Sequence, residues 1–393
     1  MTYKHTKYGC YMSYFTSAVI NNLAPLLFFT FSRKFSLSVM QLGFIVTLNF
    51  LTQAIVDFLG ARYASSFGYR KAIIAAHIFA FFGLVMLGTL PYIMKPYAGI
   101  LISVVLYATG SGIIEVMVSP MVEALPGDGK NASMSFLHSF YCWGQMGVVL
   151  ISTLYFQLFS TANWRYLPYV WAILPVMSIA IFSKAPICSS DADVDAHSGF
   201  FRLLKSKALF PFFIIMLCAG ASELALSQWA SYFAESGLKV SKALGDLLGP
   251  CFFAVMMGVS RVLYGIYAEK LPLKKSIAIC SALCCIAYLM ASLSPWPMVS
   301  LLGCGLCGFS VGIMWPGTLS MAAHSVNDST AVFGILALTG DIGCTAGPTL
   351  ISLVSSRISL FGDPVKAGVL CSVIFPFLII LTMLLCGKSI KDK

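Results

Sequence analysis

The chain has 393 residues, of which 59% are hydrophobic and 10% charged, and its mean hydropathy is +0.87. These values exclude a soluble globular domain, because such a domain needs far more charged surface. The formal net charge is +10 at pH 7. The composition therefore predicts an integral membrane protein.

About twelve apolar runs are long enough to cross the membrane, since a helix needs roughly 20 apolar residues to span about 30 Å of hydrocarbon. The sequence predicts an all-α membrane protein with about twelve transmembrane helices. We expect them near residues 8–31, 42–63, 72–93, 98–122, 132–159, 164–183, 207–234, 243–267, 275–293, 297–322, 329–354 and 366–387.

The positions of lysine and arginine orient this bundle. With both termini inside, roughly two thirds of the 25 basic residues fall on the cytoplasmic side, as the positive-inside rule requires. We expect a multi-pass protein of the cell (inner) membrane with both termini and the 184–206 segment cytoplasmic. The net charge follows from this topology and implies no nucleic-acid partner.

Polar residues recur in the first two predicted helices. Asn21 and Asn22 lie within the first, and Asn49, Gln53 and Asp57 follow the i, i+4, i+8 spacing that puts them on one face of the second. A polar stripe of this length favours a cavity wall. The asparagine pair fits two roles equally, binding of solute hydroxyls or hydrogen bonding to neighbouring helices.

Ionisable residues inside predicted spans are candidates for proton coupling, because burial of a carboxylate in hydrocarbon is costly without a partner or water. Glu115 ranks first, since desolvation favours its protonated form and makes reversible protonation possible. His138, on the next helix, is either a proton relay or a neutral packing residue. Glu223 and Asp341 are the rival acids in the second half.

Amide and indole side chains complete the candidate solute site. Gln145 and Gln228 offer amides, and tryptophan rings can pack on the C–H faces of a sugar. Helix packing is the alternative role for any tryptophan, and we favour the cavity for Trp143, Trp229 and Trp315. Trp164, near a predicted helix end, is instead typical of an interfacial or packing residue.

An internal repeat divides the chain into two halves of about six spans. Residues 61–71 align with 265–275, each with a Tyr-Ala pair and a basic doublet in register. A second alignment places Pro120, Asn131, Ser133, Gly144 and Gly147 on Pro316, Asn327, Ser329, Gly340 and Gly343. We expect an N-terminal half at 1–188, a cytoplasmic linker with an amphipathic segment at 189–206, and a C-terminal half at 207–393.

On these motifs the whole chain resembles the major facilitator superfamily, whose loop between helices 2 and 3 has the form G-x-x-x-D-R-x-G-R-R. The second copy, residues 265–275, keeps an acid at Glu269 and a base at Lys270, whereas the first copy has Ser65 and Ser66. The resemblance implies a cytoplasmic gate that is weaker in the first half. Its candidate residues are Asp57, Arg70, Glu269 and Lys270.

Shorter motifs are similar to the fucose and glucose proton symporter branch. They are Gly112-x-x-Glu115-x-x-x-x-Pro120, His138-Ser139-Phe140-Tyr141, Gly220-Ala221-Ser222-Glu223 before Trp229, and Gly312-x-x-Trp315-Pro316. One departure is that Pro25 stands after Asn21-Asn22-Leu23-Ala24, where the fucose symporter carries an acid. The resemblance implies proton coupling, but this departure removes one acid of the usual pair.

The sequence favours a secondary transporter that moves a small polar solute, such as a monosaccharide, by alternating access with protons as coupling ions. A drug or metabolite exporter of the same fold is the alternative. An intramembrane enzyme is disfavoured, since no nucleophile with a base and no HExxH-type metal site occurs. We expect no cofactor, no metal and a monomer. The residues expected to bind solute in one central volume are Asn21, Asn22, Gln53, Tyr141, Gln145, Gln228, Trp229 and Trp315.

Overall fold

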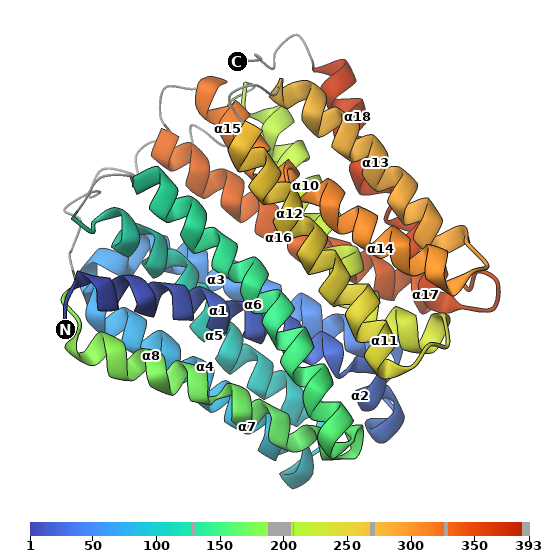
Figure 1. The fold of residues 1–393 in the computed structure, drawn as a ribbon, viewed down its shortest axis with the longest axis horizontal. Coiled ribbons are helices and arrows are strands. Elements are labelled where there is room, and N and C mark those ends of the chain that lie inside the picture. Colours follow the sequence, from blue (N-terminus) through green and yellow to red (C-terminus); the bar gives the residue numbers. More distant parts are fainter. Residues whose placement is uncertain (127–129, 188–205, 207, 268–271, 326–328, 387–393) are drawn as a thin grey trace. The chain divides into compact units, whose positions relative to one another are not determined.

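The computed structural model describes residues 1–126, 130–187, 206, 208–267, 272–325 and 329–386 (Figure 1). Nearly all of these residues are helical. Eleven helices are long and apolar enough to cross a membrane, or twelve if the bent pair α1 (Tyr3–Leu26) and α2 (Phe28–Phe35) forms one span. The predicted all-α, multi-pass fold is therefore confirmed.

The chain forms two compact units. Unit 1 comprises Met1–Leu37 and Leu48–Ala192, and unit 2 comprises Ser38–Thr47 and Asp193–Lys393. Unit 1 contains α1, α2, most of α3 (Val39–Phe67), α4 (Tyr69–Ile93), α5 (Pro96–Glu123), α6 (Lys130–Phe159), η1 (Thr161–Tyr166), α7 (Leu167–Trp171) and α8 (Ile173–Lys184). Except for residue 206, the predicted 189–206 linker lies outside the described residues.

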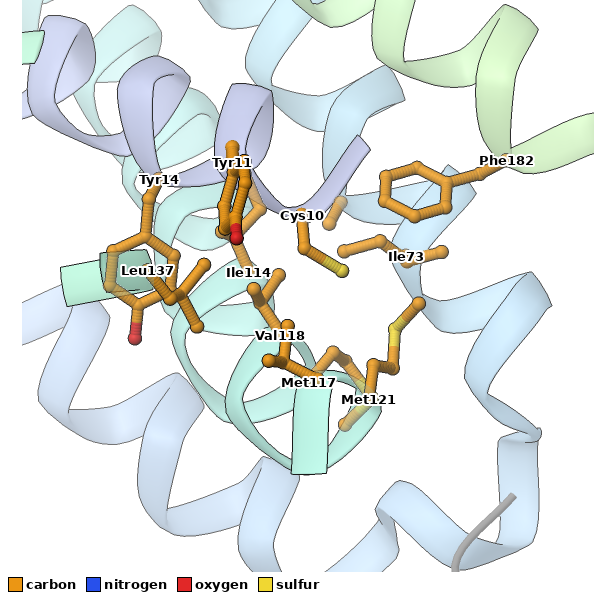
Figure 2. Packing of buried hydrophobic residues seen from close by; sticks show 12 residues of the cluster. Cys10, Tyr11, Tyr14, Ile73, Ile114, Met117, Val118, Met121, Leu137 and Phe182 are labelled. Carbon is orange, nitrogen blue, oxygen red and sulfur yellow. The ribbon is translucent and has the colours of Figure 1, made fainter. Parts of the chain in front are cut away.

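Small residues allow close helix packing in unit 1. α4 runs along α5, and α1 packs against α5, α6 and α8. At Gly83 an added Cβ would lie 2.4 Å from the backbone nitrogen of Tyr107, so only glycine permits this approach of α4 to α5. Where α1, α4, α5, α6 and α8 meet, an apolar cluster includes Cys10, Tyr11 and Ile73, with Tyr14 at its edge (Figure 2).

Unit 2 is built around α10 (Phe210–Tyr232), which packs along α16 (Ser329–Ser355). Its other elements are η2 (Phe233–Gly237), α11 (Lys242–Asp246), η3 (Leu247–Cys251), α12 (Phe252–Tyr267), α13 (Leu273–Leu293), α14 (Pro297–Val311), α15 (Met314–Ser325), α17 (Pro364–Cys371) and α18 (Ile374–Leu385). An added Cβ on Gly343 would lie 2.0 Å from the carbonyl oxygen of Leu217, so glycine sets the separation of α10 and α16.

Proline interrupts several spans that the hydropathy pattern predicts as continuous. The break between α14 and α15 starts four residues before Pro316, and that between α17 and α18 four residues before Pro376. Proline has no N–H, and its ring clashes with the carbonyl four residues earlier, so the helix kinks there. The predicted 164–183 span likewise consists of η1, α7 and α8 in succession.

Candidate functional site

Amide side chains from two helices of unit 1 form a buried hydrogen-bond network around Asn21 of α1. Asn21 Oδ1 accepts bonds from Asn49 Nδ2 at 3.0 Å and Gln53 Nε2 at 2.8 Å, both on α3. Asn21 Nδ2 donates to Tyr141 Oη of α6 at 3.2 Å and to Gln53 Oε1 at 3.4 Å. Asn21, Asn49 and Gln53 are each at most 5% exposed.

This network is a preorganised set of donors and acceptors. Buried amides need partners, and here they hold one another in fixed orientations while Tyr141 remains partly exposed. Two other predicted residues lie beside it in the sequence. Asn22 donates to the carbonyl of Ala18 on its own helix at 2.8 Å, and buried Gln145 follows Tyr141 by one helical turn.

A second polar group in unit 1 gathers around the Tyr14 hydroxyl. Tyr14 Oη and Ser119 Oγ are 3.1 Å apart, and the charges of Glu115 and Asp57 act on the same hydroxyl. The His138 ring meets the Tyr14 ring edge to face, with centroids 5.2 Å apart. Four helices, α1, α3, α5 and α6, therefore bring these side chains together.

The exposure of these groups differs. Tyr14 is 6% exposed, whereas Glu115 and His138 are both exposed. Gly112 allows α3 to approach α5, since an added Cβ would lie 3.1 Å from Asp57 Oδ1. An accessible carboxyl next to a buried hydroxyl and a histidine can exchange a proton with water and pass it to a hydrogen-bonded neighbour.

In unit 2 the predicted acid Glu223 forms an ion pair. Its Oε2 accepts a bond from Arg261 Nη2 of α12 at 3.4 Å, and the two side chains are 10% and 26% exposed. The Arg261 side chain thus turns to this carboxylate. The positive charge of Arg261 compensates the negative charge of the Glu223 carboxylate. Glu223 is therefore a weaker candidate than Glu115 for carrying an exchangeable proton.

Trp229 lies in the interior of unit 2. It is fully buried, its Nε1 donates to the carbonyl oxygen of Pro348 at 3.2 Å, and its ring meets Tyr232 edge to face. Gln228 is 1% exposed. Trp315 is partly buried, and its ring packs on the backbone of Gly340, where an added Cβ would lie 2.3 Å from the ring.

Three further residues from the sequence analysis differ in their burial. Asp341 is partly buried on α16, and its backbone oxygen accepts a bond from Thr345 Oγ1 at 3.0 Å. Trp143 is 54% exposed, in contrast to Trp229. Trp164 is fully buried and packs against Phe31 and Tyr92.

The predicted cytoplasmic gate is described only in part. Arg70 donates to the backbone oxygens of Phe182 and Ala185 at 2.5 and 2.7 Å, so it caps the C-terminal end of α8. Asp57 faces α5, as above. Glu269 and Lys270 lie outside the described residues.

Sequence reasoning missed two buried polar groups. His77 of α4 is fully buried, with Nδ1 2.7 Å from the carbonyl oxygen of Ile73 and Nε2 3.2 Å from Ser13 Oγ. The other group joins Glu235, Lys242 and Asp246. The i, i+4 spacing of Lys242 and Asp246 is the signal that could have pointed to it.

Nothing in the described part of the chain groups three or more His, Cys, Asp or Glu residues in a way that could hold a metal ion. The Sγ atoms of Cys284 and Cys307 are 3.8 Å apart. Both cysteines are fully buried between α13 and α14, where they act as small packing residues.

Comparison with known proteins finds a family match over most of the chain. Residues 10–348 match the Major Facilitator Superfamily profile. The membrane protein MosC of Rhizobium meliloti is 21% identical over 330 residues, which cover 84% of this chain and 78% of MosC.

Several solved structures share the fold. A D-xylose–proton symporter superposes with a TM-score of 0.78 at 15% identity, covering 99% of this chain and 97% of that one. A mutant of the nucleoside transporter NupG superposes with a TM-score of 0.78 at 11% identity, covering 98% of this chain and 99% of that one. A mutant of the E. coli fucose:proton symporter FucP superposes with a TM-score of 0.65 at 15% identity, covering 96% of this chain and 98% of that one.

Proposed function

This chain belongs to the major facilitator superfamily, a family of transporters rather than enzymes, and on that premise we propose that it carries a small polar solute together with protons. Monosaccharides are the first class of solute to test. The proposal draws on similarity to a D-xylose–proton and a fucose:proton symporter and on the residues of unit 1.

The amide network around Asn21 is the observation that supports a hydroxyl-rich solute. Asn21, Gln53 and Tyr141 supply both donors and acceptors within hydrogen-bond reach of one another. Such a mixed set suits hydroxyl groups, which donate and accept at once. An apolar drug would gain no hydrogen bonds from this set, which disfavours the exporter alternative.

In the proposed mechanism the two six-helix halves alternately expose the solute to either side of the membrane. The predicted boundaries are 1–188 and 207–393, with the 189–206 linker between them. Gln228, Trp229 and Trp315 are the candidate solute residues of the second half. The tryptophan faces would contact the C–H groups of the solute.

Glu115 is the proposed coupling acid. Protonation from one side neutralises its carboxylate, and a neutral group can pass through a closed intermediate at far lower cost than a bare charge. The neighbouring polar group consists of Tyr14, which is hydrogen-bonded to Ser119, and His138, whose ring meets the Tyr14 ring. Asp341 remains the alternative acid of the second half.

We further propose that the protein lies in the inner membrane of the cell, with both termini and the linker on the cytoplasmic side. We also propose that it acts as a monomer. The bias of basic residues supports this orientation. Single cysteines placed in the linker of a cysteine-depleted variant should resist impermeant maleimides in intact cells. Labelling from outside would reverse the assigned topology.

A thermal-shift screen of the purified protein tests the solute class. The panel contains monosaccharides, nucleosides, amino acids and cationic drugs at equal concentration. We expect stabilisation by a monosaccharide or another hydroxyl-rich solute, because a ligand that binds only the folded state raises the midpoint. Stabilisation by cationic drugs alone would replace the proposal with the exporter alternative.

A further inference from the structure

A charged cluster lies where α10 is followed by η2 and α11 in unit 2, and its first residue, Ser231, comes two residues after the candidate solute residue Trp229. Lys242 Nζ donates to Ser231 Oγ at 3.1 Å, to Glu235 Oε1 at 3.0 Å and to Asp246 Oδ1 at 3.0 Å. Ser231 Oγ in turn donates to Asp246 Oδ1 at 2.5 Å. All three ammonium protons of Lys242 are thus used.

The cluster holds more acid than base. Its side chains are 13% exposed for Lys242, 7% for Glu235 and 0% for Asp246. With every group ionised, two carboxylates face one ammonium, and the site carries one uncompensated negative charge. Burial of such a charge is costly, so a single proton shared by the two acids gives the neutral arrangement.

The two carboxyls differ in their access to water. Asp246 Oδ1 accepts bonds from Lys242 and Ser231 and its side chain is 0% exposed. Glu235 Oε1 accepts a bond from Lys242, and its side chain is 7% exposed. Glu235 is thus the more exposed of the two carboxyls, so water can reach it.

The neighbouring elements bring further charged groups. η2 packs against α10, α11 and α17. Asp363, the N-cap of α17, lies against Gly237, where an added Cβ would lie 2.1 Å from Oδ2. Lys366 Nζ donates to the carbonyl oxygen of Ser294 at 3.1 Å. Other titratable residues on the described elements beside the cluster are Tyr232 of α10, Cys251 of η3 and the exposed loop residue Lys239.

The backbone at the cluster is irregular in a way that permits movement. Glu235 lies in η2, a π-helical turn, and Asp246 directly precedes η3, a second one. Such turns are rare and frequently occur at functional sites. Trp229 lies six residues before Glu235 on the same continuous helical path, about 9 Å along its axis.

We propose that Glu235 binds an exchangeable proton in this cluster, and that α10 couples this proton to occupation of the solute site at Gln228 and Trp229. In the binding step, the Glu235 carboxylate takes one proton from the aqueous solution and becomes the neutral acid. The coupling to solute rests on the proposed function, whereas proton binding by Glu235 does not.

The first test needs no solute. Infrared difference spectra of the purified protein between acidic and alkaline pH record the C=O stretch of protonated carboxylic acids. We expect one carboxyl band of the wild type to be absent in Glu235→Gln and retained, shifted, in Glu235→Asp. The matched control, Ser236→Ala, removes a neighbouring hydroxyl that bonds only its own helix, to the Tyr232 carbonyl at 2.7 Å, and should keep the band.

Identical pH-difference spectra for the wild type and folded Glu235→Gln would overturn proton binding at Glu235. Glutamine preserves the bond from Lys242 and leaves one acid and one base, so this variant should fold. If Glu235→Gln does not fold, Glu235→Asp decides, because its aspartate can still titrate. A spectrum of Glu235→Asp that lacks the carboxyl band would then also count against the proposal.

The second test addresses coupling. The solute identified by the thermal-shift screen is titrated at several pH values, and its Kd is compared between wild type and Glu235→Gln. We expect the pH dependence of Kd to fall at least threefold in the variant. An unchanged pH dependence together with a lost infrared band would leave Glu235 a proton site without coupling. A screen without any hit would count against the proposed function alone.

Discussion

Removal of the Tyr141 hydroxyl tests the proposed solute site with little change in shape. In Tyr141→Phe the 3.2 Å bond from Asn21 Nδ2 is lost, and only the longer 3.4 Å contact with Gln53 Oε1 remains for that amide. Hydrogen bonds between helices in membranes contribute about 0.6 kcal/mol on average and rarely above about 1.7. We therefore expect a small loss of stability.

The expected loss of solute affinity is larger. If a solute hydroxyl bonds to Tyr141, the variant loses that bond as well and leaves a polar group of the solute unpaired, at a cost of about 1–2 kcal/mol. That corresponds to roughly a 5- to 30-fold rise in Kd. Isothermal titration calorimetry or scintillation proximity binding with the solute found in the screen gives this number.

Tyr169→Phe is the matched control. It also removes a hydroxyl that bonds across helices of unit 1, with Tyr169 Oη 2.8 Å from Thr89 Oγ1. Both variants should shift the melting temperature by a similar small amount, but only Tyr141→Phe should raise Kd. Equal effects on Kd would refute the reasoning, because the amide network would then act only as helix packing.

Other variants test the remaining contacts. Glu115→Gln should retain counterflow exchange in proteoliposomes but abolish pH-driven accumulation, and unchanged accumulation would make it a structural acid. Arg261→Gln should destabilise the protein by about 1–3 kcal/mol in thermal unfolding, since it strands the buried Glu223 carboxylate, and adding Glu223→Gln should restore most of the loss. Gly343→Ala should lower the melting temperature, because its Cβ meets the α10 backbone, whereas Gly258→Ala, with nothing within 4 Å, should leave it unchanged or raise it.

The hydropathy pattern predicted the number and approximate position of the spans because a membrane helix must be apolar over its whole length. It did not predict where spans break. The breaks before Pro316 and Pro376 follow from a local rule, but Pro120 and Pro348 lie inside continuous helices. Whether a proline ends a helix depends on what packs around it, which a single sequence does not contain.

The candidate site was predictable in part. The spacing of Asn49 and Gln53 put both on the face that meets Asn21, and the network contains all three. The pairing of Glu223 with Arg261 was not predicted, because it joins residues far apart in the sequence. The Lys242 cluster was missed because Glu235 joins the i, i+4 pair of Lys242 and Asp246 from another element, η2.

Solute accumulation in proteoliposomes tests the central claim most directly. Vesicles that contain the purified protein receive an inwardly directed proton gradient and a panel of radiolabelled monosaccharides and nucleosides. We predict that at least one of these solutes accumulates above its external concentration and that a protonophore abolishes the accumulation. Equal internal and external concentrations for every solute, or accumulation that a protonophore leaves intact, would contradict proton-coupled transport of a small polar solute.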